Sequence, residues 1–196
     1  YLDASSRLAV AQSSGSYNPH DQPPQNLLQG LFGGLEENEE ELRRAFKAMF
    51  DMDILLDYSG MTKLVLRVAK EFDEIPKDPR KAYPLLNKFS TLDTQGDGFK
   101  SFVGVVLSLL MSKGRLVLLD EPEAFLHPAQ ARQLGYWIAE HSKRSAEQII
   151  VATHNSNFLS GILVSDQPVD IFRLNRSGDR TTYTLIPSEA TENLAK

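Results

Sequence analysis

The stretch Arg115-Leu-Val-Leu-Leu-Asp-Glu-Pro-Glu-Ala-Phe-Leu-His-Pro128 decides the fold. Its run of four apolar residues, 116–119, is typical of a strand that is covered on both faces in a parallel sheet. Asp120 and Glu121 follow at the carboxyl end of this strand, where open α/β sheets place their ligands. A carboxylate there can hold Mg²⁺ directly or through water, and a second one can polarise an attacking water. The stretch therefore predicts the chemistry of nucleotide hydrolysis.

Length, composition and charge are those of an ordinary globular chain. The 196 residues are 41% hydrophobic and 24% charged, which is enough for one domain with a substantial core. The formal net charge of −5 and the pI near 5.4 predict no nucleic-acid surface in this chain. The lack of cysteine excludes disulfides and thiolate metal sites, and it is compatible with a cytoplasmic location. No apolar run approaches the roughly 18 residues of a membrane span, so no membrane segment is predicted.

The first half of the chain has a mixed pattern. Periodicity and turn residues predict, in order, a strand at 1–12, a loop at 13–29, a helix from the acids at 36–40 to Phe50, a hairpin formed by 53–58 and 61–70, and a connection at 73–84. The first strand rests on Leu2, Leu8 and Val10. Residues 13–90 are therefore predicted to be an insertion or subdomain rather than further βα units.

The second half has a clearer order. It predicts a glycine-rich turn at 93–98, an apolar helix at 99–111, the acidic strand, a helix from Pro128 to about Arg144, a buried strand at 148–152, a helix that ends near Leu163, and a hairpin formed by 170–174 and 181–186. The helix after Gly98 would point its free N–H groups back into the turn, and such an end attracts phosphate. The second buried strand is followed by Thr153-His154-Asn155.

This order resembles the carboxyl-terminal half of an ABC-type ATPase domain. The closest similarity is to the non-transporter branch, the OLD-like and RecF-like ATPases, in which Asp-Glu-Pro-Glu followed by Leu-His-Pro is a familiar form of the Walker B motif and D-loop. Residues 93–165 carry the resemblance. It implies a P-loop NTPase-like α/β fold: a mostly parallel sheet flanked by helices, a mixed α/β insertion at 13–90, and a carboxyl-terminal hairpin and tail at 166–196.

The resemblance also implies roles for single residues. Asp120 would organise Mg²⁺, Glu121 would position or deprotonate the attacking water, and His154 would be the switch histidine that hydrogen-bonds the γ-phosphate of ATP. In phosphoryl transfer, alignment and electrostatics do most of the work, so these roles require fixed placement at the sheet edge. The alternative is that the two acids only cap a strand and that His154 is an ordinary loop residue.

Two further segments have counterparts in the family. Gly96-Asp97-Gly98-Phe99-Lys100-Ser101 would be the signature motif, which contacts the γ-phosphate bound by the opposite subunit. The common form has Ser at the place of Gly96, so Lys100, Ser101 or backbone amides would have to replace its hydroxyl; the alternative is a plain glycine-rich turn. The segment from Glu123 to His127 would be the D-loop, and the alternative is that His127 only caps the next helix.

One expected motif is missing. No G-x-x-x-x-G-K-[ST] occurs in the chain, and Gly30 to Gly34 lacks both the lysine and a preceding parallel strand. In ABC domains this Walker A loop precedes every motif seen here, so it is expected upstream of Tyr1. The chain alone is therefore predicted to bind ATP weakly or not at all, and to be inactive by itself.

The predicted function is that of the carboxyl-terminal part of an ATP-hydrolysing domain. The resemblance implies ATP and Mg²⁺ as ligands, a head-to-tail homodimer, and a link to DNA metabolism or phage defence, with any DNA contacts made by other regions. Two alternatives remain open from the sequence. One is the ATPase subunit of an ABC transporter, although the transporter form Leu-Ser-Gly-Gly-Gln is absent. The other is a non-catalytic interaction module that has lost its nucleotide site.

Overall fold

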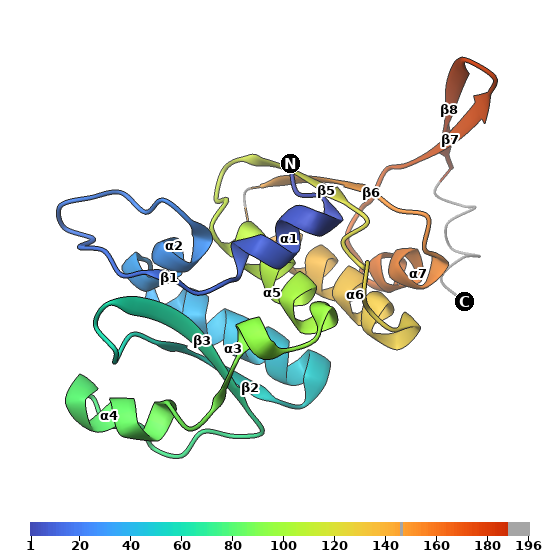
Figure 1. Ribbon diagram of the computed structural model, residues 1–196. Coiled ribbons are helices and arrows are strands. Elements are labelled where there is room, and N and C mark those ends of the chain that lie inside the picture. Colours follow the sequence, from blue (N-terminus) through green and yellow to red (C-terminus); the bar gives the residue numbers. More distant parts are fainter. Residues whose placement is uncertain (146, 188–196) are drawn as a thin grey trace.

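Helices and strands are mixed along the chain in a computed structural model that describes residues 1–145 and 147–187 (Figure 1). The elements are α1 (Ala4–Val10), β1 (Ser14–Gly15), α2 (Leu27–Gly33), α3 (Glu36–Phe50), β2 (Asp53–Asp57), β3 (Lys63–Ala69), α4 (Pro79–Leu86), β4 (Ser90–Thr91), a 3₁₀ turn η1 (Leu92–Thr94), α5 (Asp97–Leu110), β5 (Leu116–Asp120), α6 (Pro128–Arg144), β6 (Gln148–Ala152), α7 (Ser156–Val164), β7 (Ile171–Ser177) and β8 (Arg180–Ile186). The predicted α/β class is confirmed.

The two apolar runs of the second half form a parallel pair. β5 and β6 pair in register, with Leu119 opposite Val151 and Asp120 opposite Ala152. On the other side of β5, Leu2 makes a parallel bridge to Leu119. Val117, Leu119, Ile149 and Val151 belong to or pack against the core, because alternate side chains of a strand point to the same face. Within the described residues, the parallel sheet is limited to this pair and the bridge.

A second, antiparallel sheet lies between residues 14 and 91. β2 and β3 form the predicted hairpin, and β1 and β4 both pair with β3. α3 runs beside this sheet and also contacts α5. The antiparallel sheet and the parallel pair are thus connected through helices rather than through shared strands.

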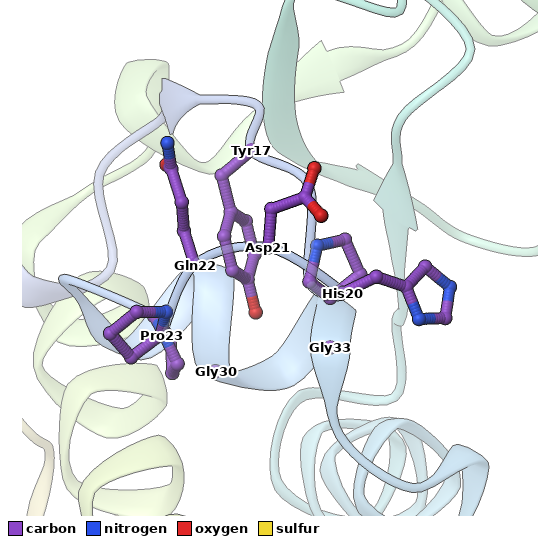
Figure 2. Close-up of a pocket in the computed structure, with 9 residues that line it drawn as sticks. Tyr17, His20, Asp21, Gln22, Pro23, Gly30 and Gly33 are labelled. Carbon is purple, nitrogen blue, oxygen red and sulfur yellow. The ribbon is translucent and has the colours of Figure 1, made fainter.

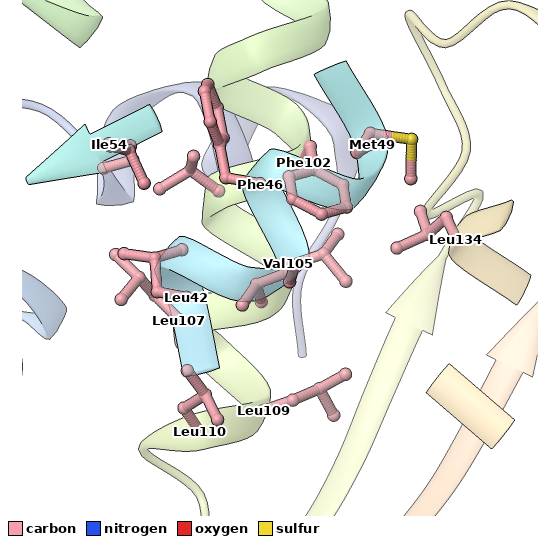
Figure 3. Packing of buried hydrophobic residues seen from close by; sticks show 14 of the residues in the cluster. Leu42, Phe46, Met49, Ile54, Phe102, Val105, Leu107, Leu109, Leu110 and Leu134 are labelled. Carbon is pink, nitrogen blue, oxygen red and sulfur yellow. The ribbon is translucent and has the colours of Figure 1, made fainter. Parts of the chain in front are cut away.

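Helix α5 is the centre of the core. Its residues 101–107, 109 and 110 are all buried. Figure 3 shows side chains of α3 and α5 packed against each other. Phe46 and Phe50 of α3 meet Phe99 and Phe102 of α5, with ring centroids 4.3 to 6.3 Å apart. Aromatic contacts of this kind stabilise the packing of α5 against α3 beyond the burial of apolar area alone. They therefore fix the position of α5 and of the turn that precedes it.

The predicted strand at 1–12 is wrong over most of its length, because residues 4–10 form helix α1. The Asp3 side chain accepts hydrogen bonds from the backbone N–H groups of Ser5 and Ser6 and so caps the helix. Hydrogen bonds from Ser6 and Ser5 lower the pKa of Asp3 to about 2. Only Leu2 keeps a strand-like contact, in its bridge to β5.

The predicted connection at 73–84 is also partly wrong, since α4 begins at Pro79. Asp78 caps the helix through its contact with the Arg80 N–H, and proline is well suited to the first helical position, where an N–H would have no partner. Pro84 lies inside this helix. In the same way, the predicted loop at 13–29 contains β1 and ends in the first residues of α2.

The carboxyl-terminal hairpin forms as predicted. β7 and β8 pair over seven residues each, and Figure 1 shows the hairpin extending away from the helices. The predicted tail at 188–196 lies outside the described residues.

Helices α6 and α7 cross so closely that only glycine fits at the contact. A Cβ atom on Gly161 would lie 1.9 Å from the carbonyl oxygen of Arg132. A Gly-to-Ala change inside a helix usually stabilises it, but here the helices would have to separate. We expect Gly161→Ala to lower the free energy of unfolding by about 1 to 3 kcal/mol, measured by urea titration. Gly15→Ala is the control, because nothing lies within 4 Å of its added Cβ; equal stability losses in both variants would contradict this packing.

Candidate functional site

The carboxyl ends of β5 and β6 bring two predicted site residues together. Because the strands are parallel and in register, Glu121 and His154 leave the sheet at the same edge. The Nδ1 atom of His154 lies 2.6 Å from Oε1 of Glu121. The side chains remain accessible, with exposed fractions of 80% for His154 and 46% for Glu121. An accessible imidazole and carboxylate in contact with each other can act on a ligand placed above this edge.

Glu121 has an unusual backbone conformation. Its φ angle of 46° lies in the left-handed region, which is uncommon for a residue with a side chain. Its N–H donates to the Ala152 carbonyl at 2.8 Å, and its carbonyl accepts from Nη2 of Arg7 at 2.7 Å. Such a conformation costs about 1 to 3 kcal/mol and persists where surrounding contacts hold it. The contacts from Ala152 and Arg7 provide this support and turn the Glu121 side chain towards His154.

Asp120 is held from three sides. Its N–H donates to the Leu2 carbonyl at 3.2 Å, and its carbonyl accepts from Nη1 of Arg7 at 2.7 Å. Its carboxylate accepts a hydrogen bond from the Tyr1 hydroxyl at 3.0 Å. This hydrogen bond raises the pKa of Tyr1. The amino-terminal residues therefore contribute to the placement of the acid.

Glu123 joins the two loops that follow the strands. It is buried, and its Oε1 accepts a hydrogen bond from the Thr153 hydroxyl. That hydroxyl in turn accepts from the N–H of Asn155. The other carboxylate oxygen of Glu123 is buried with no hydrogen-bond partner among the described residues. Glu123 thus connects the loop after β5 to the residue that precedes His154.

The segment Gly96–Ser101 is placed at the start of α5, as predicted, but its members differ in accessibility. Gly96 is the exposed N-cap, and no side chain caps the helix. Lys100 pairs with Asp97 at 3.4 Å. A Cβ atom on Gly98 would lie 2.9 Å from the Phe125 carbonyl, so this glycine is required by the contact with the loop after β5.

Ser101 is the buried member of this segment. It is fully buried, its hydroxyl accepts from Nε of Arg7 at 3.2 Å, and it donates to the Ala124 carbonyl at 3.1 Å. Both hydrogen-bonding functions of the hydroxyl are therefore used inside the protein, and Ser101 is not available to a phosphate in this structure.

His127 is the N-cap residue of α6. Its backbone N–H donates to Oε1 of Gln130 at 3.1 Å, and the residue is exposed. This geometry agrees with the alternative in which His127 serves to begin the helix.

Arg7 is the important residue that sequence reasoning missed. The interpretation of 1–12 as a strand gave Arg7 no role. A usable signal was present, since Asp3 followed by Ser5 and Ser6 is a helix N-cap pattern, and the helix turns Arg7 inward.

A separate pocket of about 390 Å³ lies beside α2 (Figure 2). It is lined by Tyr17, Pro19, His20, Asp21, Gln22, Pro23, Pro24, Gly30 and Gly33. None of the predicted site residues borders it. Glu121 and His154 thus lie at an open sheet edge and not in this pocket.

Solved structures of SMC ATPases have a similar fold. An SMC ATPase studied for ATP-driven dimerization and DNA-stimulated activation is 15% identical, with a TM-score of 0.51, over 81% of this chain and 91% of that chain. The Smc head domain of Pyrococcus furiosus, solved with an extended coiled coil and bound to the C-terminal domain of ScpA, is 14% identical, with a TM-score of 0.58, over 81% of this chain and 37% of that chain. The Smc head domain of Pyrococcus yayanosii is 12% identical, with a TM-score of 0.55, over 82% of this chain and 28% of that chain.

The chain therefore spans less than half of the two Pyrococcus structures, and at these identities the likeness concerns the fold. The fold is that of the ABC-type P-loop ATPases. More narrowly, residues 39–160 match the profile of the family described as "AAA domain, putative AbiEii toxin, Type IV TA system", and the chain belongs to this family. No curated protein sequence matches the chain. Among the described residues, no helix is both long and apolar enough to span a membrane.

Proposed function

We propose that this chain is the carboxyl-terminal part of an ATP-hydrolysing ABC-type domain of the non-transporter, OLD-like branch. The observation that carries the proposal is the 2.6 Å contact between Glu121 and His154 at the carboxyl ends of two parallel strands. Glu121 positions and deprotonates the attacking water, and His154 contacts the γ-phosphate through the ring nitrogen that Glu121 does not use. Asp97 and Lys100, with the backbone at Gly96 and Gly98, remain the proposed contacts to the nucleotide of the partner subunit.

The residues present fit a bound Mg²⁺. Mg²⁺ is usually held by one or two carboxylates together with substrate phosphates and water, and it does not require a cage of protein ligands. No group of three His, Cys, Asp or Glu side chains within the described residues could hold a metal ion alone. Asp120 would therefore bind Mg²⁺ together with the phosphates of ATP, and the ion would neutralise charge that develops on them.

We further propose that the phosphate-binding loop comes from sequence that precedes Tyr1. One face of the parallel pair supports this proposal: Leu116 and Ile150 lie on it with exposed fractions of 55% and 57%. Parallel sheets are almost always covered on both faces, so an apolar face of this kind is suited to a further layer. The outer edge of β6 is also free of a strand partner among the described residues, and a P-loop strand could pair there.

The proposed partner is a second copy of the same protein, arranged head to tail. The exposed start of α5 is then available to the nucleotide of the other copy. The description of one structurally similar SMC ATPase names ATP-driven dimerization and DNA-stimulated activation, and the family description names a putative toxin of a toxin–antitoxin system. Both support a link to DNA metabolism or phage defence rather than to transport. With a net charge of −5, contacts to DNA would come from other regions.

Two proteins compared side by side test this function. Residues 1–196 alone are expected to show no micromolar binding of Mg-ATP in isothermal titration, because they lack a phosphate-cradling loop. A longer parent that contains the loop is expected to hydrolyse ATP only when Mg²⁺ is present, and to dimerise with ATP in sedimentation experiments. Micromolar binding by residues 1–196 would contradict the assignment of the loop to preceding sequence. A parent without Mg²⁺-dependent hydrolysis would contradict the function itself.

A further inference from the structure

We propose that Arg7 is a positioning residue of this site: its buried guanidinium holds the backbone of Asp120 and Glu121 in place and connects it to α5. The catalytic consequence of this role rests on the proposed function, whereas the holding contact itself does not. Arg7 contacts neither reacting atoms nor a ligand here, so its effect would be exerted through Glu121.

All three nitrogen atoms of the guanidinium are used. Nη1 donates to the Asp120 carbonyl and Nη2 to the Glu121 carbonyl, both at 2.7 Å. Nε donates to the Ser101 hydroxyl at 3.2 Å. Arg7 is fully buried, with an exposed fraction of 0%. The planar fork of arginine matches two successive carbonyl groups, and this geometry is not available to the single ammonium of lysine.

The choice of acceptors is informative. Buried arginines usually pair with a carboxylate, but within the described residues no carboxylate oxygen lies within 4.0 Å of the Arg7 nitrogens. Burial lowers the pKa of Arg7, while the nearby charges of Glu123, Asp120, Asp3 and Glu121 oppose that shift. The guanidinium therefore places a permanent positive charge among acids. It donates hydrogen bonds to the backbone carbonyl groups of Asp120 and Glu121 and not to their carboxylates.

The same contacts reach α5. Ser101 accepts from Arg7 and donates to the Ala124 carbonyl, so one hydroxyl links α1, α5 and the loop after β5. A Cβ atom on Gly104 would lie 2.5 Å from the Arg7 carbonyl oxygen, which means that glycine permits the close approach of α1 to α5. Arg7 thus connects the left-handed backbone at Glu121 to the helix whose first residues are proposed to contact the partner's nucleotide.

The first arm of the test measures amide hydrogen exchange in the full chain. In Arg7→Lys, exchange at residues 120–124 is expected to rise about 10- to 100-fold, because hydrogen bonds from a charged donor are lost, while exchange in α3 stays within about threefold. Arg80→Lys is the control, since the Arg80 side chain is 87% exposed, and it should leave both regions unchanged. Unchanged exchange at 120–124 in Arg7→Lys would overturn the holding role.

The second arm measures steady-state ATP hydrolysis by the longer parent. Arg7→Lys is expected to lower kcat about 10- to 100-fold with KM for ATP within about threefold, because Glu121 is displaced while the phosphate loop is intact. Ser101→Ala should lower kcat less, and its effect should not add to that of Arg7→Lys. A kcat unchanged in folded Arg7→Lys would overturn the positioning role. If the unmodified parent lacked activity, the proposed function would fail, and Arg7 would still be judged by the exchange arm.

Discussion

Replacing Glu121 by Gln in the ATP-hydrolysing parent is expected to lower kcat by about 10²- to 10⁴-fold, the usual contribution of a general base. Glutamine has the size of glutamate and still offers an oxygen to His154, so the 2.6 Å contact between these side chains can be kept. It cannot take a proton from water. The loss should therefore appear in kcat, while the affinity for ATP remains within a few fold.

The measurement has two parts. Steady-state hydrolysis gives kcat and KM, and sedimentation in the presence of Mg-ATP gives the fraction of dimer, which should rise because the bound nucleotide is no longer consumed. Glu37→Gln is the matched control, since this exposed acid lies in the first turn of α3 and not at the sheet edge. If Glu121→Gln retained a kcat within twofold of the unmodified protein, the water-activating role would belong to another residue.

The second large effect is expected from Arg67→Met, which leaves a buried acid without its partner. Nε of Arg67 lies 2.8 Å from Oδ2 of Asp57, and the side chains are only 9% and 3% exposed. Arg67 also donates to the Phe89 carbonyl and to Oδ1 of Asn87, so it joins β3 to the segment after α4. Removal of one member of such a pair costs about 3 to 5 kcal/mol, because a desolvated charge remains.

Urea unfolding followed by circular dichroism measures this loss. Arg44→Met is the control: Arg44 pairs with Glu41 but is 68% exposed, and its removal should cost less than about 1 kcal/mol. In the double variant Asp57→Asn with Arg67→Met, part of the stability should return, because no unpaired charge is buried. Equal losses in Arg67→Met and Arg44→Met would show that burial does not control the energetics of this pair.

Local pattern was sufficient for much of the fold. The apolar runs at 116–119 and 148–152 predict the two parallel strands, and the hairpin at 53–70 follows from two apolar-rich runs around a glycine turn. These elements could be predicted because each is specified by residues a few positions apart. The strand at 1–12 failed because Leu8 and Val10 alternate as in a strand, while the capping signal of Asp3 lies outside that pattern.

The candidate site was predicted less completely than the fold. Residue type, position after a strand and the resemblance to ABC-type ATPases together selected Asp120, Glu121 and His154 as candidates. The resemblance to the signature motif named Ser101, because its hydroxyl could replace the one that Gly96 lacks. Its burial between Arg7 and Ala124 depends on how α1 packs against α5, and no local rule contains that information.

By itself, the sequence determined that two apolar strands end in acids and in a histidine, since strand formation and polar strand ends are properties of short segments. Only the tertiary structure decided that Glu121 and His154 meet at 2.6 Å, and that Arg7 donates hydrogen bonds to the carbonyl groups of Asp120 and Glu121. The physical reason is the range of the contacts involved. Parallel pairing of β5 with β6 and the close approach of α1 to α5 join residues far apart in the chain, and these contacts form only when the whole core packs.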